Sequence, residues 1–271
     1  MAPEPTPILA LPPPVVSLTP TRDKVRFRFR KDGALRLLSH HDLMRCFERM
    51  LRRAALPVRQ SQGFHPKPRL IFALSLPLGV IGCEEVAELE LDEILPPEEV
   101  RERLVRQAPP GMDILSLRRI DFKAGAQIHS LTYRMTLPAD RTDEAARRAA
   151  ELLAAPECLV DRIRPTPRRV NLRPWLLDLK VVEGGEYSFS RDPKGSAGGG
   201  ALPFGSRLNE YSPPSAHLEM KLCLTPAGTA RPEEVLTVLG LSDLLEAGAV
   251  LERARLELVD ETPPQLAEGF A

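Results

Sequence analysis

The spacing of apolar residues changes in the same order twice along this chain, and that order is the strongest constraint on its fold. Spacings of two residues, typical of strands, alternate with spacings of three and four, typical of helices. In each half the order is strand, helix, two strands, helix, strand, as in a ferredoxin-like unit. With 271 residues, the chain is long enough for two such units, each with its own core.

The first predicted unit begins with a strand at Lys24–Arg30, in which apolar residues alternate with cations. Ser39 is the predicted N-cap of the following helix, and Asp42 stands at the capping-box spacing. The remaining segments of this unit are strands at Leu56–Gln60, Leu70–Leu76 and Glu85–Leu91, a helix at Pro97–Gln107 and a closing strand at Met112–Ile120.

The second unit repeats the order of predicted strands and helices without repeating the amino-acid sequence. Its predicted segments are a strand at His129–Leu137, a helix at Thr142–Ala155, central strands at Leu159–Arg164 and Trp175–Val182, a strand at His217–Leu224, a short helix at Pro232–Leu239 and a last strand at Leu251–Val259. Residues 183–215 are rich in Gly, Ser and Pro and are predicted to form a long mobile loop.

We therefore expect an α+β fold of two tandem ferredoxin-like (βαββαβ) units with a disordered Pro-rich N-terminal tail. The expected boundaries are 1–22 for the tail, 23–124 for the first unit, 125–262 for the second and 263–271 for a C-terminal tail. The composition is that of a globular protein, and no apolar run approaches the ~18 residues of a membrane span. The N-terminus lacks the basic start of a secretion signal, so a cytoplasmic protein without a membrane contact is expected.

The four cysteines are isolated from one another, at Cys46, Cys83, Cys158 and Cys223. None has the close spacing that holds zinc or an iron–sulfur cluster, so reduced thiols, no metal site and no cofactor are expected.

Positive charge is concentrated near the N-terminus although the formal net charge of the chain is zero. Residues 22–69 carry fourteen Lys or Arg against four acids, whereas residues 84–113 carry ten acids against three Arg. Clustered charge steers a ligand even when the total is balanced. The acids of the strand near residues 84–92 are expected to guard an exposed sheet edge, or alternatively to dock a basic partner.

The helix after Ser39 is predicted to be amphipathic. Apolar residues recur on one side at helical spacing, which leaves four arginines on the other side: Arg45, Arg49, Arg52 and Arg53. Most charge runs are simply solvated, but Glu48 is the only acid within this run, which favours a surface that binds a polyanion.

The loop at residues 61–69 is predicted to be stiff and cationic. Gly63 permits a tight turn, and Pro66 and Pro68 restrict the backbone around them. Phe64 offers a face for a nucleic-acid base, and polar donors surround it at Gln62, His65, Lys67 and Arg69. In the alternative interpretation the loop is only a structural connection, in which Phe64 fills the core and His65 hydrogen-bonds a backbone carbonyl.

A second basic stretch contains Arg162, Arg164, Arg168, Arg169 and Arg173, and the two basic patches are expected to flank one cleft.

Three histidines admit a catalytic alternative. His40 and His41 start the first helix, where the helix dipole favours a neutral imidazole, and His41 with His65 would form an acid/base pair for RNA cleavage. The architecture resembles that of the tandem ferredoxin-like endoribonucleases that mature CRISPR transcripts, but their glycine-rich C-terminal signature is missing.

Two motifs also resemble a known family. The Ser-His-x-Asp helix start (Ser39, His40, Asp42) and the loop Ser61-Gln62-Gly63-Phe64-His65-Pro66-x-Pro68 are similar to the core of the radical-SAM-associated domain family of unknown function. The resemblance covers about residues 24–262; in the weaker echo at residues 168–174, Asn171 stands where that family tends to carry an acid. It implies an accessory to a radical-SAM protein, and because this chain lacks a cysteine triplet, another chain must hold the cluster.

The expected function is therefore a non-catalytic RNA-binding accessory that presents tRNA or rRNA to a separate radical-SAM enzyme. The expected RNA contacts are the helix arginines, Gln62, Phe64, His65, Lys67 and Arg69, together with Arg168, Arg169 and Arg173. The alternatives are a metal-independent endoribonuclease that uses His41 and His65, and a protein-docking module without nucleic acid.

Overall fold

A computed structural model describes residues 22–163, 165–183 and 216–261. The predicted C-terminal tail lies outside these residues, as do the predicted N-terminal tail except Arg22 and the predicted mobile loop except Glu183. Within them, no helix has the length and apolar character needed to cross a membrane.

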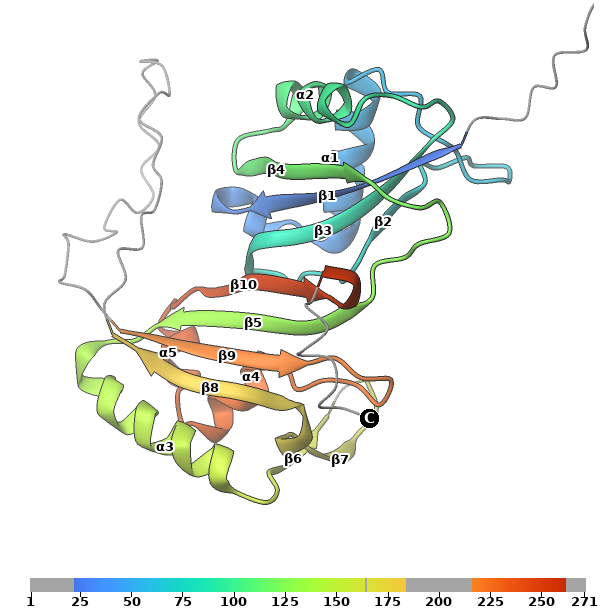
Figure 1. Cartoon of the computed structure of the whole chain (residues 1–271). Helices are drawn as coiled ribbons and strands as arrows, with labels where there is room; N and C mark the ends of the chain where they lie inside the picture. The colour runs from blue at the N-terminus through green and yellow to red at the C-terminus, as the bar shows by residue number, and fades with distance from the viewer. Residues whose placement is uncertain (1–21, 164, 184–215, 262–271) are drawn as a thin grey trace, which may run out of the picture.

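The fold is of the mixed α+β class, as expected, with one large sheet and five α-helices in the described part of the chain (Figure 1). The first half contributes β1 (Asp23–Lys31), α1 (His40–Arg53), β2 (Leu70–Phe72), β3 (Ile81–Leu91), α2 (Pro97–Gln107) and β4 (Met112–Arg119). The second half contributes β5 (Ile128–Thr136), α3 (Thr142–Ala154), β8 (Leu176–Val182), β9 (His217–Cys223), α4 (Pro232–Val238), α5 (Ser242–Glu246) and β10 (Leu251–Leu258). A separate two-stranded sheet is formed by β6 (Leu159–Arg162) and β7 (Arg168–Asn171).

The eight-stranded sheet runs without a break through both halves. Its order is β4-β1-β3-β10-β5-β9-β8, and β2 pairs with β3 outside this path. The halves meet where Ile81 and Gly82 of β3 run parallel to Glu252 and Arg253 of β10. All other pairs in this sheet are antiparallel.

Each half has its own apolar core against its helices. In the first half, Val25, Phe27 and Phe29 of β1 pack against Phe47 of α1 and against α2. In the second half, the inward residues of β5, β9 and β10 pack against α3 and α4. Burial of aromatic and aliphatic side chains is the main stabilising contribution to both layers.

The helices of both halves pack on the same face of the sheet, and α1, α4 and α5 lie behind the strands in Figure 1. Arg253 and Tyr133 are register partners on the helix-covered face of the second half. Arg253 forms an ion pair with Glu85, which lies opposite the core residue Phe29 in the first half. The opposite face carries no helix in the described part of the chain, and its charged side chains are paired, for example Arg134 with Glu219.

The acidic strand β3 is central, which corrects the expectation of an edge guard or a docking strip. It pairs with β1, β2 and β10, and two of its acids are almost completely buried. Glu85 pairs with Arg253, and Glu88 pairs with Lys24 at 2.7 Å and with Arg26 at 2.8 Å. The basic face expected for β1 is therefore largely neutralised within the sheet, because an uncompensated buried charge would be very costly.

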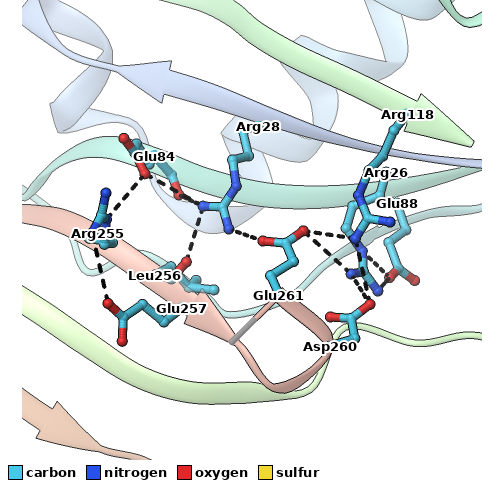
Figure 2. Close-up of polar contacts among 10 residues, drawn as sticks. All are labelled: Arg26, Arg28, Glu84, Glu88, Arg118, Arg255, Leu256, Glu257, Asp260 and Glu261. Carbon is cyan, nitrogen blue, oxygen red and sulfur yellow. Dashed lines mark hydrogen bonds and ion pairs between the residues drawn. The ribbon is translucent and has the colours of Figure 1, made fainter. Parts of the chain in front are cut away.

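The end of β10 continues this charge pairing across the helix-free face. The short 3-10 turn η4 (Val259–Glu261) places Asp260 2.6 Å from the Arg26 guanidinium. Glu261 pairs with Arg28 and lies 2.9 Å from Arg118 of β4 (Figure 2). A segment of the second half thereby holds two strands of the first half.

Several predicted segments differ from the structure. Residues 56–60 form only isolated bridges, from Val58 to Leu91 of β3 and from Gln60 to Pro68, because the chain leaves the end of β3 here to form a hairpin. The strand predicted at Leu70–Leu76 ends at Phe72, where the chain bends away from β3. Neither strand predicted to be central in the second unit is central: β6 pairs only with β7, a strand that was not predicted, and β8 lies at the sheet edge beside β9. Helix α5 was not predicted either, because its five residues are too few for a helical pattern to emerge.

We expect the buried ion pair at the junction to be essential for stability. Arg253 and Glu85 side chains are 1% and 3% exposed, with a distance of 2.8 Å from Nε to Oε1. Replacing Arg253→Ala leaves a buried carboxylate without its partner and is expected to lower the free energy of unfolding by about 3–5 kcal/mol in chemical denaturation. The matched control Arg255→Ala removes a largely exposed cation of the same strand; equal losses for both variants would contradict this role.

We expect the η4 contact to make stability depend on pH. Burial alone would raise the pKa of Glu261, but hydrogen bonds from Arg118 and Arg28 outweigh burial and lower this pKa below its ordinary value. The stabilisation is therefore present above the unfolded-state pKa and is lost as pH falls through the lower folded-state pKa. Between about pH 6 and pH 3, the wild-type chain should lose more unfolding free energy than Glu261→Gln. Parallel losses in the two proteins would show that the contact contributes nothing.

Candidate nucleic-acid interface

Helix α1 is fixed in rotation by its cap and by its apolar side. The Ser39 hydroxyl accepts a hydrogen bond from the Asp42 backbone N–H at 3.2 Å, which confirms the predicted N-cap. Phe47 is fully buried, and its ring lies 5.2 Å from that of Phe29 and 5.3 Å from that of Phe72. The side of α1 opposite Phe47 must therefore face solvent.

That opposite side carries the four predicted arginines, and all are exposed. Arg45 lies 3.4 Å from Asp42, and Arg53 donates hydrogen bonds to Gln107 of α2. Within the described part of the chain, Arg49 and Arg52 have neither an ion pair nor a hydrogen bond from their side chains. The C-terminal half of α1 thus presents two uncompensated guanidinium groups.

The segment after α1 forms a hairpin, which we call the proline hairpin (residues 58–69). Gln60 bridges to Pro68, and the Ser61 backbone N–H donates to the Lys67 carbonyl at 2.8 Å. At its turn Gly63 has a φ of 132°, which side-chain-bearing residues rarely adopt. The base is fastened to β3, because the Arg59 N–H donates to the Glu90 carbonyl and the Glu90 N–H donates to the Arg69 carbonyl. The hairpin therefore projects from the sheet while hydrogen bonds hold its base in place.

The tip of the proline hairpin is open to solvent. Phe64 is fully exposed, so the alternative in which it fills the core is wrong. His65, Lys67 and Arg69 are also exposed, and none of these three side chains has an ion pair or hydrogen bond to a described residue. An aromatic ring with unpaired cations beside it is the surface that single-stranded nucleic acid requires.

The helix and the hairpin enclose one hollow, which we call the hairpin cleft. Its volume is about 590 Å³, within the usual range of ligand sites. The lining residues are Glu48, Leu51 and Arg52 of α1, Leu56 and Val58 of the connection, and Gln60, His65, Pro66, Lys67 and Pro68 of the hairpin. Gln62 lines a second hollow of about 490 Å³ on the other side of the hairpin, with Asp92 at its rim.

Charge distinguishes the hairpin cleft from another hollow, which lies on the sheet. A depression of about 430 Å³ on the helix-free face is also lined by cations, but these are paired with acids. Arg134 lies 2.8 Å from Glu219, Lys180 2.7 Å from Asp178, and Lys221 2.9 Å from Glu257. Paired cations attract a polyanion only weakly, so the hairpin cleft is the better candidate.

The structure does not bring the predicted catalytic histidines together. His65 lines the hairpin cleft beside the C-terminal half of α1, whereas His41 lies at the exposed N-terminal start of the helix. The eleven residues from His41 to Arg52 correspond to about 16 Å along a helix axis. His40 packs its ring 5.6 Å from Phe72 instead of facing the cleft.

The second basic stretch lies elsewhere, which corrects the expectation of two patches around one cleft. Arg168 and Arg169 are exposed on β7, next to the second-half core and at the opposite end of the sheet from α1 (Figure 1). Arg162 is buried against Glu234 at 2.6 Å, and half-buried Arg173 donates to the carbonyls of Leu153 and Leu176. These last two arginines are structural.

The cysteines are all free thiols. Burial raises the pKa of Cys83 to about 11, which disfavours a reactive thiolate. Among the described residues, no three or more His, Cys, Asp and Glu side chains are grouped as a metal site requires.

We expect Phe64 to be dispensable for folding. Phe64→Ala should change the free energy of unfolding by less than about 0.5 kcal/mol, because its side chain contacts solvent. The matched variant Phe47→Ala creates a cavity in the core and should cost about 3–5 kcal/mol. Denaturant titration of both variants measures the free energy of unfolding. A large decrease in Phe64→Ala would show that the Phe64 ring stabilises the fold.

Comparison with known proteins gives one family. Residues 24–199 match a family described as an uncharacterized protein conserved in bacteria (DUF2344). Nothing in this match links that family to radical-SAM proteins, so the association stays a prediction. A search of curated proteins gave no match.

A crystal structure of an unknown protein from Galdieria sulphuraria aligns with 88% of this chain and 99% of its own chain, at 12% identity and a TM-score of 0.23. A likeness this weak carries no argument about fold or function.

Proposed function

The chain belongs to this family of uncharacterized bacterial proteins, and we propose that it binds RNA through the hairpin cleft. The observation that supports the proposal is the location of the Lys and Arg side chains that have no partner. Among the described residues, the Lys and Arg side chains without an ion pair, hydrogen bond or ring contact are Arg49, Arg52, Lys67, Arg69, Lys123, Arg168 and Arg169. The first four belong to α1 and the proline hairpin, and two of them, Arg52 and Lys67, line the hairpin cleft.

The side chains around the cleft favour an RNA with unpaired bases over a uniform duplex. Cations neutralise phosphates, and this accounts for affinity without sequence information. Fully exposed Phe64 offers a stacking face, while Gln60 and Gln62 offer amide groups that pair with base edges. Because the prolines and the backbone hydrogen bonds at its base hold the hairpin in shape, little ordering entropy is lost on binding.

We further propose that residues 23–124 and 125–262 are two ferredoxin-like units. The chain order within each half supports this, with one hairpin inserted after the first helix. The strand orders also correspond: β4-β1-β3-β2 in the first half and β10-β5-β9-β8 in the second. Two separate apolar clusters accompany them.

The proposed biological role is a non-catalytic accessory in the cytoplasm that presents tRNA or rRNA to a radical-SAM enzyme. It rests on the resemblance of the Ser39-His40-x-Asp42 and Ser61–Pro68 motifs to the radical-SAM-associated family. The four isolated cysteines cannot hold the cluster of such an enzyme, so the catalyst would be a separate chain.

The proposal predicts a steep loss of RNA binding when the cleft charges are removed. The variant Arg49→Ala, Arg52→Ala, Lys67→Ala should bind single-stranded RNA at least about tenfold more weakly, because three phosphate contacts are lost. The slope of log affinity against log salt should fall by about 2. Titration by fluorescence anisotropy measures both, and crosslinking in cells followed by RNA sequencing identifies the RNA.

The control replaces three exposed but ion-paired arginines, in the variant Arg106→Ala, Arg147→Ala, Arg255→Ala, which should bind as the wild type does. Weak RNA binding by the wild type without a steep salt slope, unchanged in both triple variants, would favour a docking module without nucleic acid. RNA cleavage that His41→Ala and His65→Ala each abolish would instead establish the endoribonuclease alternative.

A further inference from the structure

The two halves carry hairpins at equivalent places in the chain. In the first half, the proline hairpin lies between α1 and β2. In the second half, the β6–β7 hairpin lies between α3 and β8. Each hairpin therefore leaves the sheet layer after the first helix of its half.

The tips of these hairpins also share a sequence pattern. Residues 64–69 read Phe-His-Pro-Lys-Pro-Arg, and residues 163–168 read Ile-Arg-Pro-Thr-Pro-Arg. Both consist of a large apolar residue, any residue, Pro, any residue, Pro and Arg. Phe64 is fully exposed and Ile163 is 74% exposed, so each apolar residue projects into solvent.

The unpaired cations follow the same pattern. Arg168 and Arg169 have no ion pair or hydrogen bond from their side chains to the described residues, as is true of Lys67 and Arg69. Neighbouring Arg162 forms an ion pair with Glu234, and its guanidinium carbon lies 5.7 Å from the centre of the Trp175 ring. This contact anchors β6 to the second half, and it leaves the positive charge of β7 available.

We propose that the β6–β7 hairpin is a second RNA-binding site, equivalent to the proline hairpin, which contacts the phosphates of the same RNA strand through Arg168 and Arg169. The proposal rests on the RNA binding proposed for the hairpin cleft. Four steps between neighbouring strands, of about 4.8 Å each, separate β3, to which the proline hairpin is fastened, from β8, a distance of roughly 20 Å across the sheet. One RNA must bridge this distance, and two linked contacts strengthen binding beyond either alone.

The test compares three double charge reversals by anisotropy titration with oligouridylate of about 30 nucleotides, a probe long enough to reach both sites. The variants are Arg168→Glu/Arg169→Glu at the second hairpin, Arg52→Glu/Lys67→Glu at the cleft, and Arg106→Glu/Arg147→Glu as the control. All three change the net charge equally, and circular dichroism verifies their folding.

We expect the second-hairpin and the cleft variants each to bind at least about tenfold more weakly than the control. Binding by the second-hairpin variant equal to that of the control, while the cleft variant is impaired, overturns this inference and leaves the cleft proposal intact. Control-like binding by both overturns the cleft proposal as well.

Discussion

Charge pairing within the sheet decides where positive charge stays available on this molecule. Strand β3 lies between β1 and β10, and its acids Glu85 and Glu88 neutralise cations of both neighbours. Buried cations require such partners, because desolvation of an unpaired charge would exceed the stabilisation from packing. The turn η4 adds Asp260 and Glu261 on the helix-free face (Figure 2). The remaining unpaired cations then lie mainly on α1 and on the two hairpins.

The apolar core supplies the second condition for a binding surface. Phe47, packed against Phe29 and Phe72, sets the rotation of α1 and so points Arg49 and Arg52 outward. The backbone bonds between residues 59, 69 and 90 hold the proline hairpin beside that face. Neither element forms the cleft alone. The shape of the cleft depends on the sheet, which positions both α1 and the proline hairpin.

Local patterns predicted the local elements well. The Ser39 cap and the Pro97 start of α2 are strong helix signals, and both helices begin where the sequence indicates. Exposure of the arginine face followed from the 3.6-residue period alone. The cleft itself was half predictable: charge and proline content singled out residues 61–69, but no pattern shows which hollow they line.

Long-range pairing explains the failures. Alternating acids look the same at an edge and in a sheet centre until their partners are known, and Arg253 lies 168 residues from Glu85. Likewise, Arg162 and Arg168 have the same sequence character but opposite roles, because Glu234 lies beside the first and not the second. Pairing of this kind is fixed by topology and not by neighbouring residues.

We propose that the proline hairpin and the arginine face of α1 hold one RNA strand between them. Ultraviolet crosslinking of the full chain to uridine-containing RNA, followed by mass spectrometry of the crosslinked peptides, shows which residues touch the RNA. We expect RNA to be attached to the peptide that contains Phe64. Attachment confined to peptides of the helix-free sheet face, with the hairpin peptide unmodified, would overturn the proposal.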